Sequence, residues 1–208
     1  MRLQRLRRRW LQQLQQWANC GELLQAAQRA LKLEHTPKAL QELINRLAAG
    51  EQEQLPPIQV LPEKAIRGAA GAYAKTTQTI YLNRHWLNKV SNDAVITVLT
   101  AEFGHHLDAQ LNAADTPGDE GNRFASLLLK NSQKQPFIRK LGEQEHGLIF
   151  VNNQWIEAEF ENWTGNTGGD NYPNAVDGDD NSSDDSLTGN SGNDTIHGGA
   201  GNDTIRGK

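Results

Sequence analysis

The first fifty residues repeat apolar positions with the period of an α-helix. Leucine and tryptophan recur three or four residues apart in the opening segment, at Leu3, Leu6, Trp10, Leu14 and Trp17. This spacing predicts a helix with one apolar face. Because glycine and proline interrupt helices, the breaks at Cys20-Gly21, Thr36-Pro37 and Gly50 divide residues 1–50 into two or three of them.

Residues 51–161 mix short strand patterns with longer helical ones. A loop leads into a short strand at residues 58–61, and strand-forming residues flank a Lys-Thr-Thr-Gln turn within residues 73–82. A second hairpin is predicted at residues 147–157, where Asn152-Asn153 suits a type I′ turn. These strands and the helices around them predict an α+β fold, a mainly helical N-terminal body with a small sheet.

Two further helices are predicted inside this region. Apolar residues four apart predict a helix at residues 92–113 with a continuous apolar stripe, made of Val95, Leu99, Phe103, Leu107 and Leu111. A second helix is predicted to begin after Thr116 as its N-cap, with Pro117 in the first helical position and Asp119 reaching back. It should end at Leu129.

Beyond Glu161 the chain consists almost entirely of Gly, Asn, Asp, Ser and Thr. This shift in composition places a domain boundary there and sets residues 162–208 apart. Two consecutive nonapeptides, residues 189–197 and 198–206, follow the pattern G-G-x-G-x-D-x-U-x, in which U is a large apolar residue. The first of them departs from the pattern only at Asn190.

Two looser repeats precede this pair. Residues 180–188 keep an aspartate and a leucine in phase, and residues 165–173 fit with Asp170 and Tyr172, while residues 174–179 break the register. One apolar residue in nine buries too little surface to offset the entropy of the chain, so folding must be supported by something bound. A disordered, solubilising tail is the alternative interpretation.

The repeat suits calcium for a physical reason. Glycines allow the left-handed backbone of a tight loop, so carbonyl oxygens turn inward beside the aspartate carboxylate. Calcium accepts about six to eight oxygen ligands, and these loops offer little else. The calcium ligands predicted in this way are Asp170, Asp185, Gly189, Gly192, Asp194, Gly198, Gly199, Gly201 and Asp203. We therefore expect a short calcium-dependent parallel β-roll.

These repeats resemble the RTX, or hemolysin-type, calcium-binding repeats of bacterial proteins exported by type I secretion. The resemblance implies an extracellular or cell-surface protein, exported without an N-terminal signal peptide and poor in cysteine. The N-terminus indeed carries no apolar signal segment, and Cys20 is the one cysteine. In that family each ion lies between loops two repeats apart, which implies one full site between residues 180–185 and 198–203. The loop at residues 189–194 has only Gly207-Lys208 to pair with, so the array stops in mid-pattern, which favours a fragment or a shortened paralogue.

Charge is unevenly distributed along the chain. The formal net charge is -4, yet five arginines lie within residues 1–9 and eight aspartates without glutamate lie within residues 165–208. The arginines could bind nucleic acid or a membrane, but the solvated face of an amphipathic helix explains them. No segment reaches the roughly 18 apolar residues of a membrane span. The expected partners are calcium ions and an unidentified extracellular or cell-surface partner, without nucleic acid.

The body contains part of a zinc-peptidase pattern. Glu102-Phe103-Gly104-His105 supplies the last four positions of H-E-x-x-H, and the run from Glu120 to Ala125 is similar to an E-A-N-x-F-A run. On these residues the body resembles a zincin metallopeptidase, in which Glu102 would activate water and His105 and Glu120 would bind zinc. Residues 55–157 also resemble the N-terminal module of large cyanobacterial RTX proteins, for which no activity is firmly established.

Position 101 is alanine where the pattern needs its first histidine. His105 and Glu120 alone are one ligand short of the three that catalytic zinc usually has, which argues against zinc. His106 lies about 100° around the helix from His105 and cannot simply replace the missing histidine. Asp108 lies on the His105 side and could serve a different metal.

The sequence thus leaves three interpretations open. The first is a secreted calcium-binding protein with a non-catalytic zincin-like body, and Ala101 favours it. The second is a secreted metal-dependent peptidase with an RTX tail. The third is an unrelated helical fold whose helix face carries Glu102, His105 and Asp108 without function.

Overall fold

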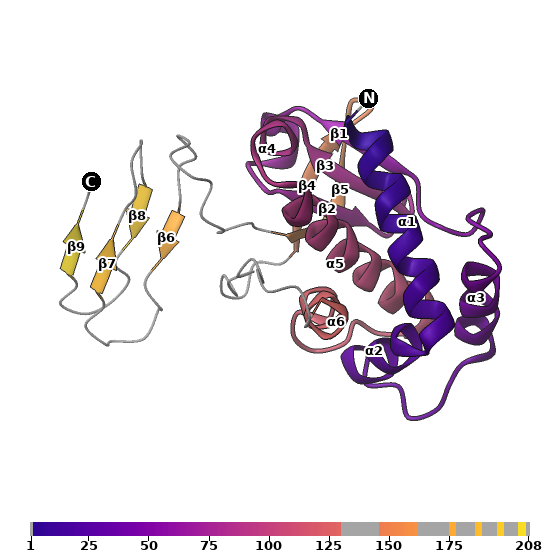
Figure 1. Cartoon of the computed structure of the whole chain (residues 1–208). Coiled ribbons are helices and arrows are strands. Elements are labelled where there is room, and N and C mark those ends of the chain that lie inside the picture. Colours follow the sequence, from indigo (N-terminus) through magenta and orange to yellow (C-terminus); the bar gives the residue numbers. More distant parts are fainter. Residues whose placement is uncertain are drawn as a thin grey trace.

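The N-terminal region is helical, as predicted. The computed structural model describes residues 2–129, residues 146–161 and four short strands nearer the C-terminus. Its first elements are helices α1 (Arg2–Cys20), α2 (Glu22–Ala30) and α3 (Lys38–Ala48), shown in Figure 1. Gly21 joins α1 to α2 with a φ of 80°, a conformation that glycine adopts without strain.

Helix α1 is amphipathic. Its buried residues include the predicted leucines and tryptophans, namely Leu6, Trp10, Leu14 and Trp17. Arg5, Arg7 and Arg8 are exposed, as the solvated face of an amphipathic helix should be. Arg2 donates to the carbonyl oxygens of Leu87 and Val90, and Arg9, which is also exposed, forms a surface ion pair with Asp93 at 2.9 Å.

Five strands form one mixed sheet. They are β1 (Ile58–Leu61), β2 (Gly71–Ala74), β3 (Thr79–Asn83), β4 (His146–Val151) and β5 (Gln154–Glu161), in the spatial order β1-β3-β2-β5-β4. Strand β1 pairs in parallel with β3, and the other neighbours are antiparallel. A short 3-10 helix, η1 (Glu63–Ile66), follows β1.

Both predicted hairpins are present. Strands β2 and β3 form the first, and β4 and β5 form the second, in which Asn152 and Asn153 have φ angles of 50° and 63°. Two consecutive residues with positive φ are what a type I′ turn requires. The structure therefore confirms an α+β body with a mainly helical N-terminal part and a small sheet.

Three helices follow the first hairpin. Helix α4 (Arg84–Lys89) is capped by Asn83, whose side chain accepts from the backbone of His85 and Trp86. Helix α5 (Asn92–Leu111) is capped by Ser91. The predicted start of α6 was wrong: α6 (Glu120–Leu128) has Asp119 as its N-cap, with the Asp119 carboxylate accepting from the backbone of Asn122 at 2.7 Å. None of the described helices is long and apolar enough to cross a membrane.

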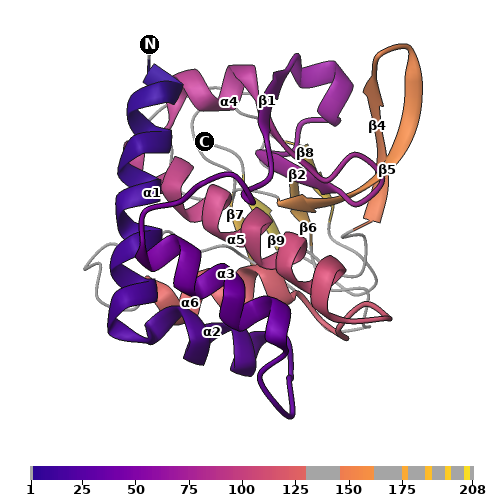
Figure 2. The same cartoon turned by 90° about the vertical axis from the view of Figure 1, so that its right-hand side faces the viewer.

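Helix α5 lies at the centre of the body. In Figure 2 it runs between α1 on one side and the strands on the other. Every residue from Ala94 to Asp108 is buried, so the buried surface of this helix extends well beyond the predicted apolar stripe. Polar side chains on a buried helix need partners within the protein, which makes them candidates for a site.

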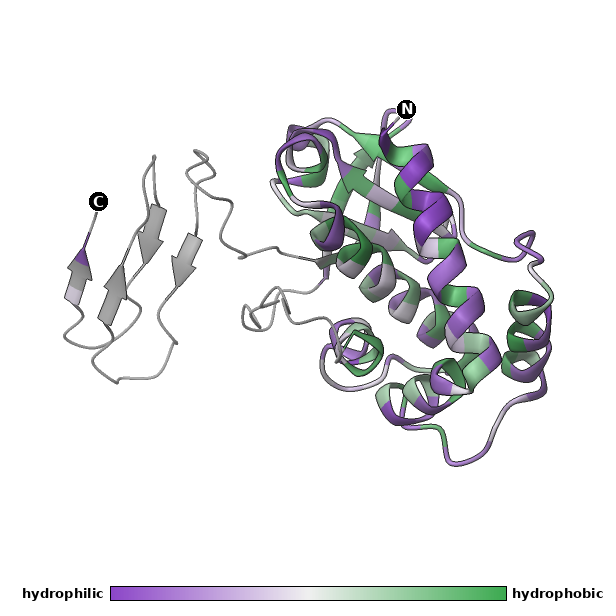
Figure 3. Ribbon diagram, in the orientation of Figure 1, coloured by the Kyte–Doolittle hydropathy of each residue, from purple (hydrophilic) through white to green (hydrophobic). Residues whose placement is uncertain are grey.

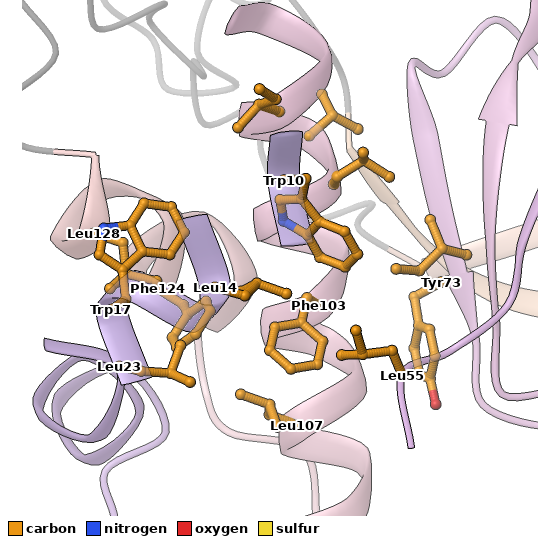
Figure 4. Close-up of a cluster of buried hydrophobic side chains, with 14 of the residues drawn as sticks. Trp10, Leu14, Trp17, Leu23, Leu55, Tyr73, Phe103, Leu107, Phe124 and Leu128 are labelled. Atoms are coloured by element: carbon orange, nitrogen blue, oxygen red, sulfur yellow. The ribbon is translucent and has the colours of Figure 1, made fainter. Parts of the chain in front are cut away.

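Aromatic rings join the helices in the main core. Trp10 of α1 and Phe124 of α6 meet Phe103 of α5 edge to face, with ring centroids 5.8 Å and 6.1 Å apart (Figure 4). The indole nitrogen of Trp10 donates to the hydroxyl of Thr100 at 3.2 Å, so this buried polar group is paired. Hydrophilic residues gather on the outer side of α1 (Figure 3).

Among the described residues, the two faces of the second hairpin are packed to different degrees near its turn. Ile149 and Ala158 belong to a small buried cluster with Tyr81 on the sheet face away from α5. On the opposite face of the hairpin, Phe150 and Trp155 lie with ring centroids 5.1 Å apart and are 39% and 58% exposed. Strand β4 forms an edge of the sheet among the described strands.

Four three-residue strands are described beyond the body: β6 (Ala175–Asp177), β7 (Ser186–Thr188), β8 (Thr195–His197) and β9 (Thr204–Arg206). Strand β6 pairs in parallel with β8, and β7 pairs in parallel with β9. Strands β7, β8 and β9 lie where the nonapeptide pattern predicts them. Strand β6 was missed, because Val176 precedes Leu187 by eleven residues rather than nine.

Two glycines bring α5 and α6 together. A methyl group added at Gly104 would lie 2.7 Å from the Cα atom of Gly121 and 3.0 Å from the Cβ atom of Phe124. A methyl group at Gly121 would lie 2.4 Å from the Nε2 atom of His105. Because real Cβ atoms do not come this close, both positions require glycine as long as the helices keep this separation.

We expect Gly104→Ala to destabilise the protein by about 1–3 kcal/mol through overpacking at the helix crossing. Alanine favours a helix over glycine by about 1 kcal/mol, so propensity alone predicts the opposite sign. Urea unfolding followed by circular dichroism measures the difference. Ser126→Ala, at an exposed position of α6, is the matched control and should change stability little. An unchanged or higher stability of Gly104→Ala would contradict the tight crossing.

Candidate functional site

Three potential metal ligands converge at the junction of α5, α6 and β5. The Nδ1 atom of His105 lies 2.7 Å from a carboxylate oxygen of Glu120 and 2.6 Å from a carboxylate oxygen of Glu159. Their ligand atoms all lie within 4.8 Å of one another. His105 and Glu120 are each 2% exposed at the side chain, and Glu159 is 16% exposed.

Each of the three elements places its residue for a simple reason. His105 lies on the side of α5 that faces Gly121, and the glycine lets α6 approach closely. Glu120 is the first residue of α6, directly after the Asp119 N-cap. Glu159 is the cross-strand partner of Tyr73 in β2, and directly opposed residues of an antiparallel pair point to the same face of the sheet.

The two carboxyl groups have pKa values displaced in opposite directions. Burial raises the pKa of Glu120, and the negative Glu159 raises it further, against the hydrogen bond and charge of His105. Burial alone would raise the pKa of Glu159 too, but the hydrogen bond and charge of His105 outweigh it and lower that pKa, with help from His146 and Lys75. Of the two carboxyl groups, therefore, Glu159 carries a negative charge more readily and Glu120 holds a proton more readily.

A second group of carboxylates lies beside the first. Asp108, Asp115 and Glu120 also have oxygens within 4.8 Å of one another. The Asp108 carboxylate already accepts from the backbone nitrogen of Thr116 at 3.1 Å, from the hydroxyl of Thr116 and from the side chain of Asn112 at 2.7 Å. Asp115 is exposed and lies 3.3 Å from His146.

These contacts give Asp108 and Thr116 a structural role. The Thr116 hydroxyl binds Asp108 at the end of α5 instead of capping α6, which explains why α6 begins later than predicted. Asp108 is not a member of the His105 group, although the sequence placed it on the same side of the helix. As a metal ligand, Asp108 would have to give up hydrogen bonds that hold the α5–α6 loop.

Glu102 lies one turn before His105 in α5 and is completely buried. A methyl group added at Gly71 of β2 would lie 2.5 Å from one of its carboxylate oxygens, so Glu102 packs directly against that strand. Neither carboxylate group described above includes it. Ala101, in the first histidine position of the pattern, is also completely buried. The proposed catalytic role of Glu102 stays a prediction.

His106 does not take part in the His105 cluster. It accepts or donates one hydrogen bond with the hydroxyl of Tyr73 at 3.0 Å and stacks on Phe103 at a centroid distance of 5.9 Å. Burial lowers the pKa of His106 to about 4, and burial raises the pKa of Tyr73 to about 12. Both side chains are therefore neutral near pH 7.

The sequence predicted His105 and Glu120 as neighbours but missed Glu159. In β5 the apolar residues Ile156, Ala158 and Phe160 alternate with glutamates, which predicts that the glutamates face solvent. Only the pairing of β5 with β2 turns the end of that polar face toward α5. The predicted calcium ligands, from Asp170 to Asp203, lie outside the described residues, which include only the strands between their loops.

The folded pKa of His106, about 4, is below its unfolded value of about 6.5. Above about pH 6.5 the ring is neutral in both the folded and the unfolded state, and the contribution of its burial to the free energy of unfolding is fully present. As the pH falls toward 4, the unfolded chain binds a proton that the folded protein does not, and the free energy of unfolding falls by roughly 3 kcal/mol. In His106→Gln the side-chain amide can still form a hydrogen bond with the Tyr73 hydroxyl, but it does not titrate. We expect urea midpoints at about pH 7 and about pH 4.5 to differ less in this variant than in the unmodified protein. Equal acid losses in both proteins would contradict this assignment.

One comparison with known proteins finds a match. Residues 179–208 match the family model for the RTX calcium-binding nonapeptide repeat (4 copies). No curated protein and no solved structure matches the chain. The match covers the repeats that end in β7, β8 and β9, while β6 and Asp170 precede it. The C-terminal segment of the chain therefore carries calcium-binding repeats of RTX type.

Proposed function

We propose that this chain is an exported protein whose C-terminal segment folds into a parallel β-roll when it binds calcium. The observation that carries the proposal is the parallel pairing of strands two repeats apart, β6 with β8 and β7 with β9. Successive strands of such a roll alternate between two sheets, so each strand has its partner two repeats away. Loops that connect the strands then lie one above another, where one ion can bind two of them.

The strand register supports particular loop pairs. Leu187 is opposite Ile205 in the β7–β9 pair, which supports one calcium site between residues 180–185 and 198–203. Val176 is opposite Ile196 in the β6–β8 pair. This second pairing supports a further site between the loop before β6 and residues 189–194. We propose the loop before β6, rather than Gly207-Lys208, as the partner of residues 189–194.

Export and extracellular location rest on the RTX match together with the cysteine content. Cys20 is exposed, and no second cysteine exists to pair with it. Small secreted domains usually rely on disulfides for stability. Calcium bound by the repeats would supply a comparable constraint only outside the cell, where calcium is abundant, so folding would follow export.

For the body we propose a zincin-like scaffold without peptidase activity. The contact between His105 of α5 and Glu120 of α6 supports the likeness, since these are the two positions that match the motifs. Ala101 supports the lack of activity, because a zincin would bind its metal with a histidine there. The alternative, a metal-dependent peptidase, is favoured by Glu102, which keeps the position of the water-activating glutamate in the motif.

We expect calcium to order the repeats and to leave the body unchanged, because the body has its own buried core, whereas each repeat contributes about one large apolar residue in nine. In a calcium titration followed by circular dichroism, β signal should rise while helical signal stays level. Resistance of the C-terminal segment to protease should rise in parallel. Equal resistance in calcium and in chelator would contradict calcium-dependent folding.

Substitutions test the loop pairing within the same experiment. Asp185→Ala and Asp203→Ala should each remove the same site, so the double variant should lose no more calcium affinity than either single variant. Asp184→Ala, next to a predicted ligand but out of phase with the repeat, is the matched control and should bind as the unmodified protein does. Independent, additive losses from Asp185 and Asp203 would mean that the two loops do not share an ion.

A peptidase assay tests the body separately. We expect no cleavage of an unfolded protein substrate in calcium with added zinc, because the histidine of the first motif position is absent. Glu102→Gln is the control for contaminating proteases, since it removes the candidate water-activating carboxylate and should leave any background unchanged. Cleavage that disappears in Glu102→Gln would establish the peptidase alternative.

A further inference from the structure

The His105 cluster joins three elements that are far apart in the sequence. His105 comes from the middle of α5, Glu120 from the first turn of α6 and Glu159 from β5. The hydrogen-bonded pairs they form are 2.7 Å and 2.6 Å long and share one atom, the Nδ1 of His105. Two acidic oxygens from different elements are thus directed at one point in the interior.

One proton on the Nδ1 atom of His105 cannot satisfy both carboxylates. An imidazole nitrogen carries either one hydrogen or one lone pair, so it can donate fully to only one of the two carboxylates. Two carboxylates held together in a buried place repel each other unless a positive charge lies between them. A metal ion at that point would accept a lone pair from all three side chains at once.

We propose that His105, Glu120 and Glu159 form a binding site for one first-row divalent metal ion, for which zinc is the best probe. One imidazole and two carboxylates are a donor set found with zinc, manganese and ferrous iron, whereas calcium prefers oxygen ligands alone. Zinc ligands at about 2.0 Å from the ion lie roughly 3.3 Å from one another. Side-chain rotations that lengthen the two distances from His105, now 2.7 Å and 2.6 Å, to roughly 3.3 Å would therefore make room for the ion.

Glu159 changes the conclusion drawn from Ala101. Without it, His105 and Glu120 are two protein ligands, too few to hold zinc in the usual way. With it, the site has three, and the third comes from the sheet rather than from the helix that carries the motif. The proposed site concerns metal binding only, and it stands whether or not the body hydrolyses peptides.

The site also predicts which part of the fold the ion stabilises. Glu159 lies in the strand that connects the β4–β5 hairpin to β2, while the other two ligands lie on packed helices. A bound ion would tie this strand to α5 and α6. Metal binding should therefore raise the thermal stability of the body, because an ion that binds only the folded state stabilises it.

The test uses the full chain, freed of metal by chelator and then saturated with calcium so that the repeats are occupied. Calorimetric titration with zinc should give one ion per chain, and zinc should raise Tm. In Glu159→Gln and in His105→Gln zinc affinity should fall at least about tenfold, and the rise in Tm should disappear. Cobalt supplies a spectroscopic readout, because visible absorption of bound Co²⁺ reports the ligands directly.

Two control variants separate this site from its neighbours. Glu157→Gln changes an exposed glutamate on the same face of the same strand and should bind zinc as the unmodified protein does. Asp115→Asn removes a member of the adjacent carboxylate group and should also leave affinity unchanged. Circular dichroism in calcium confirms that each variant is folded before zinc is added.

The outcomes decide the proposal in both directions. One zinc ion whose binding depends on His105 and Glu159 but not on Glu157 supports it. No zinc or cobalt binding by the folded, calcium-saturated protein overturns it. Binding that survives both Glu159→Gln and His105→Gln also overturns it, since the ion would then lie elsewhere, for example in the aspartate-rich repeats. A loss of binding in Asp115→Asn would assign the metal to the neighbouring carboxylates and would overturn it too.

Discussion

The body depends on one close contact between two helices. Gly104 of α5 and Gly121 of α6 lack side chains at the point where the helices cross, so the backbones approach within a distance that any larger residue would prevent. The short distance between the helices determines how far the Glu120 side chain reaches into the interior. It also presses Gly121 against the imidazole of His105, which orients the ring toward the carboxylates. The same close contact therefore determines both how the two helices pack and where the side chains of the candidate site lie.

Much of the fold could be predicted from the sequence because its signals are local. The helical period of α1, the Asn152-Asn153 turn and the apolar residues of α5 each lie within a short segment. The start of α6 was predicted wrongly for a non-local reason. Thr116 has the chemistry of an N-cap, but the buried Asp108 carboxylate competes for its hydroxyl, and Asp119 takes the capping position. Sequence spacing does not reveal which of two acceptors a hydroxyl will meet.

The candidate site shows the same limit. His105 and Glu120 could be recognised because each belongs to a motif with fixed spacing, whereas Glu159 belongs to none. The alternating glutamates of β5 look like those of any strand with one side in water. Only the order of strands in the sheet brings Glu159 to α5. In the repeats, the nine-residue period located β7, β8 and β9, but the longer spacing before β7 concealed β6. Short-range patterns predicted strands and candidate ligands, and long-range pairing decided which of them meet.

The second hairpin affects how the protein behaves in concentrated solution. Among the described strands, β4 lies at an edge of the sheet, and its sequence, His-Gly-Leu-Ile-Phe-Val, contains neither proline nor lysine. These are the residues that commonly protect a sheet edge from joining another chain. Leu148, Phe150 and Trp155 expose apolar surface beside that unprotected edge. Self-association, where it occurs, should begin by strand addition at β4, so the colloidal stability of the protein depends on the six residues of this edge strand.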